Sequence, residues 1–392
     1  MGSAVKAGYL PTLDGWRAIA ILAVLFDHQV EYSPLRHYPR FVAFSHTGPN
    51  GVSLFFAISG FLICSRLLEE HNAFGKISLG GFYIRRACRI LPPALLYLFV
   101  IGLLSLLGLI VVSSWDWWSS ILFFRNYLPG ALITRGWGGY TIHYWSLAVE
   151  EHFYLIWPAA LVLFAKRRAR WFALILALSV ATWRTWDLHH HVFNRLIPGL
   201  LFGSRTDVRL DALLLGCLAA LIRDDDAVRS TFSERFKPWM WWTAAGAYLG
   251  VQLIYFFEGS RTYSIFESGL LALIVAGTVY GVNAPIHAFL EWHPMKSIGQ
   301  LSYSLYLWQQ LFSVPQAGSS MAILQQFPLS ALMIFLCAWI SYRFVERPFI
   351  RLGHRLAPPP TQGRDDLLCG AEAEHLPVAE TTRELTSALS LR

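Results

Sequence analysis

The chain has 392 residues, of which 55% are hydrophobic and only 15% are charged, and its mean hydropathy is +0.43. Soluble domains carry roughly 25% charged residues, so this composition excludes an ordinary soluble enzyme and predicts an all-α, polytopic integral membrane protein. The net charge of +7 does not indicate a nucleic-acid partner. The basic residues lie in short runs beside apolar segments, which is how membrane topology is encoded.

Segments long and apolar enough to cross a bilayer recur along the chain, and each needs about 17–25 residues. The first carries Arg17, Asp27 and His28 and is followed by no signal-cleavage site, so we expect it to be retained as a helix. We predict about ten transmembrane helices, at residues 13–31, 50–68, 91–112, 145–165, 171–187, 209–223, 239–257, 264–281, 300–316 and 327–346.

Lys and Arg are distributed unevenly between the alternate connections of these helices. With a cytoplasmic N-terminus, the inner connections hold runs such as 85–89 and 166–170, and the outer ones hold fewer cations. We therefore expect both termini in the cytoplasm and a multi-pass protein of the inner (plasma) membrane. Residues 1–356 form the predicted membrane domain, and the polar, acidic segment 357–392 is a predicted disordered cytoplasmic tail.

Metal binding and disulfide bonding are not predicted. The five cysteines form no C-x-x-C pair, so neither a disulfide framework nor a zinc site is supported. The triplet at 189–191 consists of three histidines, which could bind a metal, but it falls in an expected external loop and we interpret it as incidental.

Arg17 and His28 give the strongest functional signal in the chain. Eleven steps along an α-helix make close to three turns, so both side chains share one face about 16 Å apart along the axis. All residues from 18 to 26 are apolar, and charged side chains are costly within a bilayer. His28 could serve as a general base for a hydroxyl, although a histidine packed against a neighbouring helix is an equally open reading.

Two further clusters of ionisable residues have both functional and structural interpretations. Arg85, Arg86 and Arg89 precede an apolar segment and could clamp a phosphate, but a positive-inside anchor on lipid headgroups is slightly favoured. Glu150 and Glu151 open another apolar segment, where they could face the positive end of the helix dipole. Alternatively, Glu150 could reach inward as an acid, a base or an orienting partner.

Three other polar residues are favoured in structural roles. Ser53 and Ser59 lie in a segment of small residues that allows close helix approach, although they could face a cavity. Glu346 ends the tenth predicted helix, with Pro348 stopping it, and we expect Glu346 to pair with a cytoplasmic arginine.

Four motifs occur in a fixed order: Arg17-x10-His28, G-V-x-L-F-F-x-I-S-G-F-L-I at 51–63, R-R-x-x-R-I-x-P at 85–92 and W-S-L-x-x-E at 145–150. In this order they resemble membrane acyltransferase family 3, the OafA/YrhL-type O-acyltransferases, from about residue 13 to 348. The resemblance implies an enzyme without a bound cofactor that takes an acyl group, usually acetyl, from cytoplasmic acyl-CoA. The implied acceptor is a hydroxyl of a surface polysaccharide, O-antigen or related glycan, while some relatives acylate small molecules such as macrolides.

The resemblance also implies site residues. The family's motif residues fall on Arg17 and His28, with Arg85, Arg86, Arg89 and Glu150 as further candidates. Family members often have a histidine after an aromatic Y-L-W, whereas this chain has Gln309, so the role of that histidine does not carry over. We expect no additional esterase-like extracellular domain of the kind that some relatives carry.

The resulting hypothesis gives each predicted residue a role. His28 activates the acceptor hydroxyl, Arg17 orients the donor or stabilises negative charge, and the three arginines of 85–89 hold the phosphates of acyl-CoA. A covalent acyl-histidine is an alternative mechanism. Two rival classes stay open: a proton or solute transporter whose path is lined by Arg17, Asp27, His28 and Glu150, and a lipid- or glycan-binding scaffold without turnover.

Overall fold

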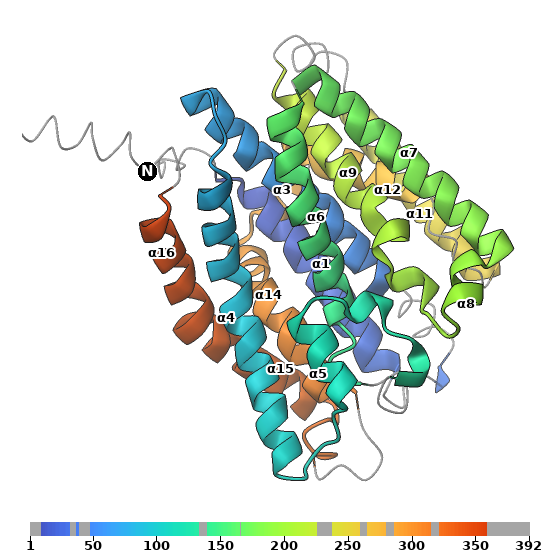
Figure 1. The fold of residues 1–392 in the computed structure, drawn as a ribbon, viewed down its shortest axis with the longest axis vertical. Coiled ribbons are helices and arrows are strands. Elements are labelled where there is room, and N and C mark those ends of the chain that lie inside the picture. The colour runs from blue at the N-terminus through green and yellow to red at the C-terminus, as the bar shows by residue number, and fades with distance from the viewer. Residues whose placement is uncertain are drawn as a thin grey trace, which may run out of the picture.

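The computed structural model describes residues 9–31, 37–38, 48–132, 139–164, 166–225, 237–258, 265–279, 286–314 and 321–358. Within these ranges the regular structure is helical and contains no β-strand, which confirms the predicted all-α class (Figure 1). The longer helices are α1 (Pro11–Glu31), α3 (Gly48–Phe74), α4 (Leu79–Leu106), α6 (Tyr144–Leu163), α7 (Lys166–His190), α9 (Thr206–Arg223), α11 (Pro238–Glu258), α12 (Ile265–Val279), α14 (His293–Ser313), α15 (Leu329–Ser341) and α16 (Arg347–Leu356).

Short helical pieces connect the longer ones. They are α5 (Ser114–Ile121), η2 (Arg125–Tyr127), η3 (Gly130–Leu132), α8 (Val192–Leu196), η4 (Phe202–Ser204), α13 (Ile286–Leu290) and η5 (Tyr342–Glu346), a π-helical turn that joins α15 to α16. η5 falls inside the predicted helix at 327–346, whereas the other six were not predicted, because hydropathy over a long window does not detect helices of one or two turns.

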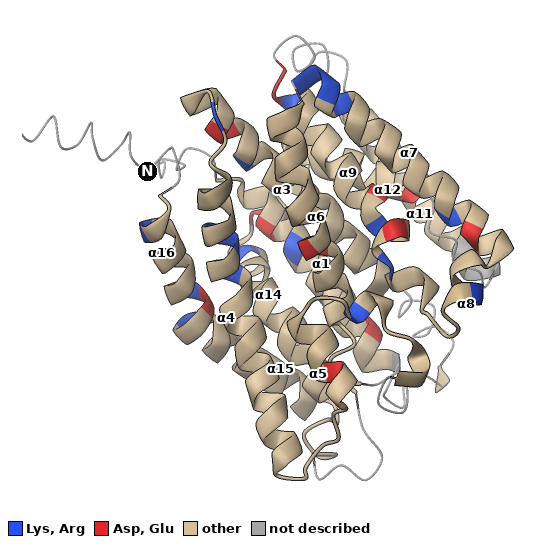
Figure 2. Cartoon of the chain, viewed as in Figure 1, with Lys and Arg blue, Asp and Glu red and all other residues tan. Residues whose placement is uncertain are grey.

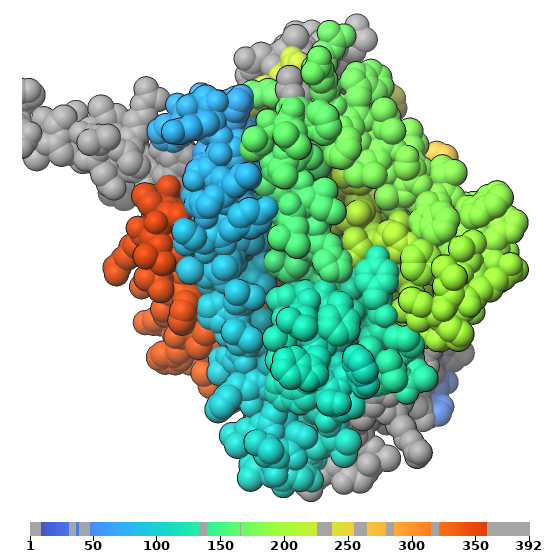
Figure 3. Space-filling view, in the orientation of Figure 1, coloured from blue at the N-terminus to red at the C-terminus, as the bar shows by residue number. Residues whose placement is uncertain are grey.

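Large apolar side chains cover the outside of the bundle. On α4 the residues Leu95, Phe99 and Leu103 lie one helical turn apart and are 50%, 67% and 47% exposed. Figure 3 shows α4, α6 and α7 side by side on one such face. Three described segments, 48–74, 79–106 and 329–356, are long and apolar enough to cross a membrane. The chain is therefore a helical membrane protein, and the predicted ten spans and cytoplasmic termini stay predictions.

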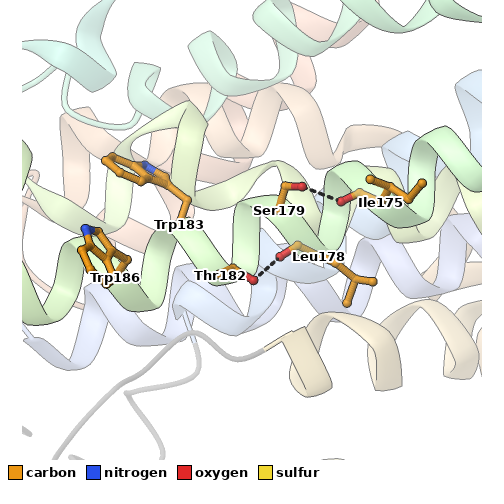
Figure 4. Close-up of a pocket in the computed structure, with 6 residues that line it drawn as sticks. All are labelled: Ile175, Leu178, Ser179, Thr182, Trp183 and Trp186. Atoms are coloured by element: carbon orange, nitrogen blue, oxygen red, sulfur yellow. Dashed lines mark hydrogen bonds between the residues drawn. The ribbon is translucent and has the colours of Figure 1, made fainter.

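The outward face of α7 satisfies its own polar groups. The hydroxyls of Ser179, Thr182 and Thr185 donate to the carbonyls four residues earlier, at 2.8, 2.9 and 3.0 Å. Because hydrocarbon offers no hydrogen bond, this arrangement suits a lipid-facing helix. The same face lines a shallow groove of about 670 Å³ (Figure 4), formed by Ile175, Leu178, Ser179, Thr182, Trp183 and Trp186.

Helix α1 lies at the centre of the bundle and packs against α3 and α14 through glycines. A Cβ atom added at Gly51 of α3 would lie 2.5 Å from the Ala20 carbonyl oxygen, and one at Gly299 of α14 would lie 1.9 Å from the Asp14 carbonyl oxygen. The α3–α9 contact is equally close at Gly60. Small residues let helices approach to backbone contact in membranes, so α1 is fixed on two sides.

Several predicted boundaries were wrong. Helix α4 begins at Leu79, twelve residues before the predicted start at 91, because Ser78 caps it and the arginine-rich segment is helical too. Pro92 and Pro93 lie inside this helix and do not begin it. Pro348 does not stop the last helix, because it falls in the first turn of α16, where a missing N–H costs nothing.

Other predictions lie close to the observed elements or outside the described residues. Helix α1 begins at Pro11 and ends at Glu31, against a prediction of 13–31, and α9 spans Thr206–Arg223, against 209–223. The predicted disordered tail from 357 lies outside the described residues after Pro358. The His189–His191 triplet ends α7 and precedes α8.

Candidate active site

Charged residues lie inside the bundle as well as at its ends (Figure 2), and one cluster joins α3, α4 and α6. Arg86 of α4 donates to a carboxylate oxygen of Glu150 on α6 at 3.3 Å, and also to the Tyr154 hydroxyl, over whose ring it lies. Glu150 accepts further hydrogen bonds from Tyr154 at 2.6 Å and from Ser59 of α3 at 2.9 Å. The carboxylate is therefore compensated by one cation and two hydroxyls.

This cluster replaces the expectation that Glu150 faces the helix dipole. Tyr144 begins α6, so Glu150 lies in its second turn, and the first turn contains no acidic residue. Ser59, for which packing was favoured, donates directly to Glu150 and is a polar member of the site.

The three arginines of the R-R-x-x-R motif point to different partners. Arg85 donates to Glu70 of α3 at 2.9 Å and to the Ala357 carbonyl, at the end of α16, at 3.3 Å. Arg86 faces Glu150, as described above. Successive residues of a helix diverge by about 100°, so adjacent arginines cannot address one ligand from the same face. Arg85 joins α4 to α3 and α16, on the side away from Glu150.

Arg17 and Arg89 are electrostatic neighbours of a buried carboxylate, and Arg17 also pairs with Asp14 at 4.0 Å. Glu346, in the π-helical turn η5, is 1% exposed and interacts electrostatically with both arginines. Ser304 of α14 donates to it at 2.7 Å. Around Arg89 the neighbouring ionised side chains are two cations, Arg17 and Arg86, and one carboxylate, Glu346. Among the described residues Glu346 forms no ion pair within 4.0 Å, so its predicted pairing with an arginine stays a prediction. The two cations beside Arg89 favour an anionic ligand at this end of the site.

His28 lies in the other half of the same helix. Its Nδ1 atom is 2.9 Å from the carbonyl oxygen of Val24. A carbonyl can only accept a hydrogen bond, so Nδ1 carries the proton and Nε2 is the basic nitrogen of the ring. Helix α1 is continuous from Pro11 to Glu31, which keeps Arg17 and His28 about 16 Å apart along its axis.

A second histidine, His143, is an electrostatic neighbour of His28. It directly precedes α6, is 3% exposed and contacts the rings of Tyr97, Tyr144 and Tyr306 edge-on, with centroids 5.2, 4.9 and 5.6 Å away. The sequence interpretation missed His143, although a histidine two residues before the W-S-L-x-x-E motif was a usable signal.

Arg209 of α9 is a further buried cation that sequence reasoning missed. It is 4% exposed, donates to the Ser53 hydroxyl at 3.2 Å and lies over the rings of Phe56 and Trp145. It also interacts electrostatically with Tyr306, which links it to the surroundings of His143. Nothing in the local sequence separates Arg209 from the other arginines that flank apolar segments.

Gln309 is fully buried in α14. Its side-chain amide donates to Gln310 at 3.2 Å, and Gln310 donates to the Gly139 carbonyl at 3.3 Å. The position therefore belongs to an amide chain between α14 and the segment that leads into α6. Among the described residues no group of three His, Cys, Asp or Glu side chains could hold a metal ion.

Comparison with known proteins places the chain in a family. The family model described as "Acyltransferase domain" matches residues 10–343, which include every residue of the site except Glu346. The chain belongs to this acyltransferase family. The O-acetyltransferase OatA of Staphylococcus aureus strain NCTC 8325 / PS 47 is 29% identical over 369 residues, covering 88% of this chain. OatA of S. aureus strain COL matches equally.

The acyltransferase spans 58% of the length of these OatA proteins, so the similarity concerns only part of each relative. No solved structure matches the chain. The geometry of the site must therefore be interpreted from the chain itself.

Proposed function

We propose that this acyltransferase moves an acetyl group from acyl-CoA, bound from the cytoplasmic side, to a hydroxyl of a carbohydrate acceptor. The observation that carries the proposal is the arrangement along α1, with Arg17 in an arginine cluster at one level and His28 at the other. The OatA proteins, named as O-acetyltransferases, support the acetyl group and the hydroxyl acceptor.

The donor end of the proposed path is the surroundings of Arg89. Arg85 and Arg86 each pair with a carboxylate, at 2.9 and 3.3 Å. Arg89, the third arginine expected to bind phosphate, has two cations and only one carboxylate around it. Arg17 lies beside it and can hold the anionic donor from α1. We therefore assign Arg17 and Arg89 to donor binding.

The acceptor end is His28. In the proposed reaction the acceptor oxygen attacks the thioester carbonyl carbon while Nε2 of His28 takes the hydroxyl proton. When the carbon–sulfur bond breaks, the CoA thiolate leaves and takes up that proton, so no oxidant or metal is consumed. Glu150, tied to Arg86, Tyr154 and Ser59, is proposed as an orienting residue between the two ends.

The experiment is acetyl transfer by the purified protein in lipid vesicles, with release of free CoA measured alongside the acetyl ester on added glycans. We expect His28→Ala to reduce transfer by at least about 10²-fold, as loss of a general base does, while expression and membrane insertion are retained. His71→Ala, at the far end of α3, is the matched control. Near wild-type transfer by His28→Ala would contradict the role of the histidine.

The same assay separates the alternatives. A transporter would move protons or solutes without releasing CoA, and a binding scaffold would form no ester. A small hydroxylated acceptor such as a macrolide would be recognised by ester formation on that molecule and not on glycans.

A further inference from the structure

The proposed reaction places a negative charge where Arg17 cannot reach it. When a hydroxyl activated by His28 attacks a thioester, the carbonyl oxygen becomes an oxyanion, which needs a hydrogen-bond donor within about 3 Å. Arg17 lies about 16 Å from His28 along α1. A donor for the oxyanion must therefore come from another element close to His28.

His143 is a buried hydrogen-bonding side chain at that position. Neither of its ring nitrogens has a hydrogen-bond partner among the described residues, although the residue is 3% exposed. Burying a polar group without a partner is unfavourable, so such groups are rare and call for a reason. His143 is an electrostatic neighbour of His28, and it packs on Tyr306 of α14, the helix whose Ser313 accepts a hydrogen bond from Gln29, next to His28 on α1.

The surroundings hold His143 in one orientation. Three tyrosine rings pack against it edge-on, and the hydroxyl oxygens of Tyr306 and Ser146 each lie 3.2 Å from its backbone carbonyl oxygen. The two hydroxyls are also 2.6 Å apart, so one donates to the other, which in turn donates to the carbonyl. A donor that is fixed before the reaction stabilises developing charge without reorganisation, which is what an oxyanion site requires.

The other cations nearby are already engaged. Arg125 faces Asp116 in a fully buried ion pair at 2.9 Å, and Arg209 donates to Ser53 between two aromatic rings. Each of these arginines is held by another side chain, although some of their nitrogens have no hydrogen-bond partner; His143 differs because neither ring nitrogen has a side-chain partner among the described residues. A neutral imidazole carries one N–H donor, which is enough for one oxyanion hydrogen bond.

We propose that His143 is a catalytic residue whose ring N–H stabilises the thioester oxyanion opposite His28. This inference rests on the proposed function. The acceptor oxygen forms a bond to the carbonyl carbon, its proton moves to Nε2 of His28, and the carbonyl oxygen gains the negative charge that His143 binds. Collapse breaks the carbon–sulfur bond, and the CoA thiolate takes the proton from His28.

The first test compares variants with and without a donor at position 143. His143→Phe keeps a ring but no N–H, and we expect its kcat to fall by about 10²–10³-fold, the loss seen when one oxyanion donor is removed. His143→Asn and His143→Gln place an amide N–H near the two ring nitrogens, and at least one should recover tenfold or more over Phe. His152→Phe is the matched control, since His152 lies on α6 and bonds Thr206.

A second measurement distinguishes oxyanion binding from packing. Acetyl-dithio-CoA, in which sulfur replaces the carbonyl oxygen, forms a weaker hydrogen bond in the intermediate. The rate ratio of oxygen to sulfur donors should be at least tenfold larger for the wild type than for the position-143 variants that lack a donor. His143→Leu gives the same comparison if the phenylalanine variant does not fold.

The outcomes separate the two proposals. An active wild type whose folded Phe variant keeps kcat within threefold, or whose oxygen-to-sulfur ratio equals that of the variants, would overturn the role of His143 alone. A wild type that forms no acetyl ester and releases no CoA would refute the proposed function, and this inference with it.

Discussion

Removing the charge of Arg86 should destabilise the protein by leaving Glu150 without its cation. The two side chains are only 19% and 16% exposed, and they are 3.3 Å apart. Breaking a buried ion pair from one side costs about 3–5 kcal/mol. Because Ser59 and Tyr154 still donate to Glu150 in the variant, we expect Arg86→Met to cost about 3 kcal/mol, at the lower end of that range.

The complementary variant, Glu150→Gln, should lower the unfolding free energy by less than Arg86→Met does. In Glu150→Gln the Arg86 guanidinium keeps its position 3.8 Å over the Tyr154 ring, a contact worth about 1–2 kcal/mol when desolvated. We therefore expect Glu150→Gln to cost about 2 kcal/mol. In the double variant no charge is left unpaired. Its loss of unfolding free energy should therefore be about 2 kcal/mol smaller than the sum of the losses of the two single variants.

The assay is reversible unfolding in mixed detergent micelles, followed by helical circular dichroism, with the four proteins measured under one condition. Arg66→Met with Glu69→Gln provides the control cycle, because that i,i+3 pair is 51% and 37% exposed and should couple by less than 0.5 kcal/mol. A coupling free energy below 0.5 kcal/mol for Arg86 and Glu150 would refute the ion-pair reasoning.

Three further predictions test packing, donor binding and membrane exposure. Gly299→Ala should lower the unfolding free energy by about 3 kcal/mol in the same assay, because its Cβ would lie 1.9 Å from a backbone oxygen of α1. Gly246 has open space around it, so Gly246→Ala should leave the unfolding free energy unchanged or raise it by up to about 1 kcal/mol. Arg89→Met should raise the KM for acetyl-CoA at least tenfold, while Arg85→Met should lower stability and change this KM less than threefold; equal KM effects would contradict the separation of the two arginines. Thr182→Val should change the unfolding free energy by less than about 0.5 kcal/mol, since the hydroxyl bonds only its own helix; a larger loss would show a partner outside α7.

The sequence was sufficient for the class of fold and for most long helices. Hydrophobic windows located α1 and α9 to within three residues at each end. The method failed at the start of α4, where charged residues at 85–89 lowered the hydropathy of a segment that is nevertheless helical. It also failed at Pro348, because a proline that begins a new turn looks like one that ends a helix.

The sequence singled out ionisable residues inside the bundle better than it indicated their neighbours. Arg17 and His28 lie at two levels of α1 and Glu150 lies on α6, and ionisable groups in apolar helices are costly enough to mark such positions. Their partners Ser59, Glu346 and His143 come from other helices, and one sequence carries no information on which of several faces meet. The separation of Arg85 from Arg86 follows from helix geometry, but their acceptors, Glu70 and Glu150, required the fold.

The glycine contacts of α1 have a consequence for the kind of donor the enzyme can use. Arg17 and His28 belong to one continuous helix, which backbone contacts at Gly51 and Gly299 hold between α3 and α14, so the interval between them can shorten only if α1 bends or breaks. In the proposed reaction the acyl carrier would have to bridge about 16 Å, which suits a long, thin, flexible arm anchored by its phosphates. Helix α1 thus fixes the distance that the proposed donor has to span. A short activated acyl compound such as acetyl phosphate could bind near Arg17 or near His28 but could not reach from one to the other.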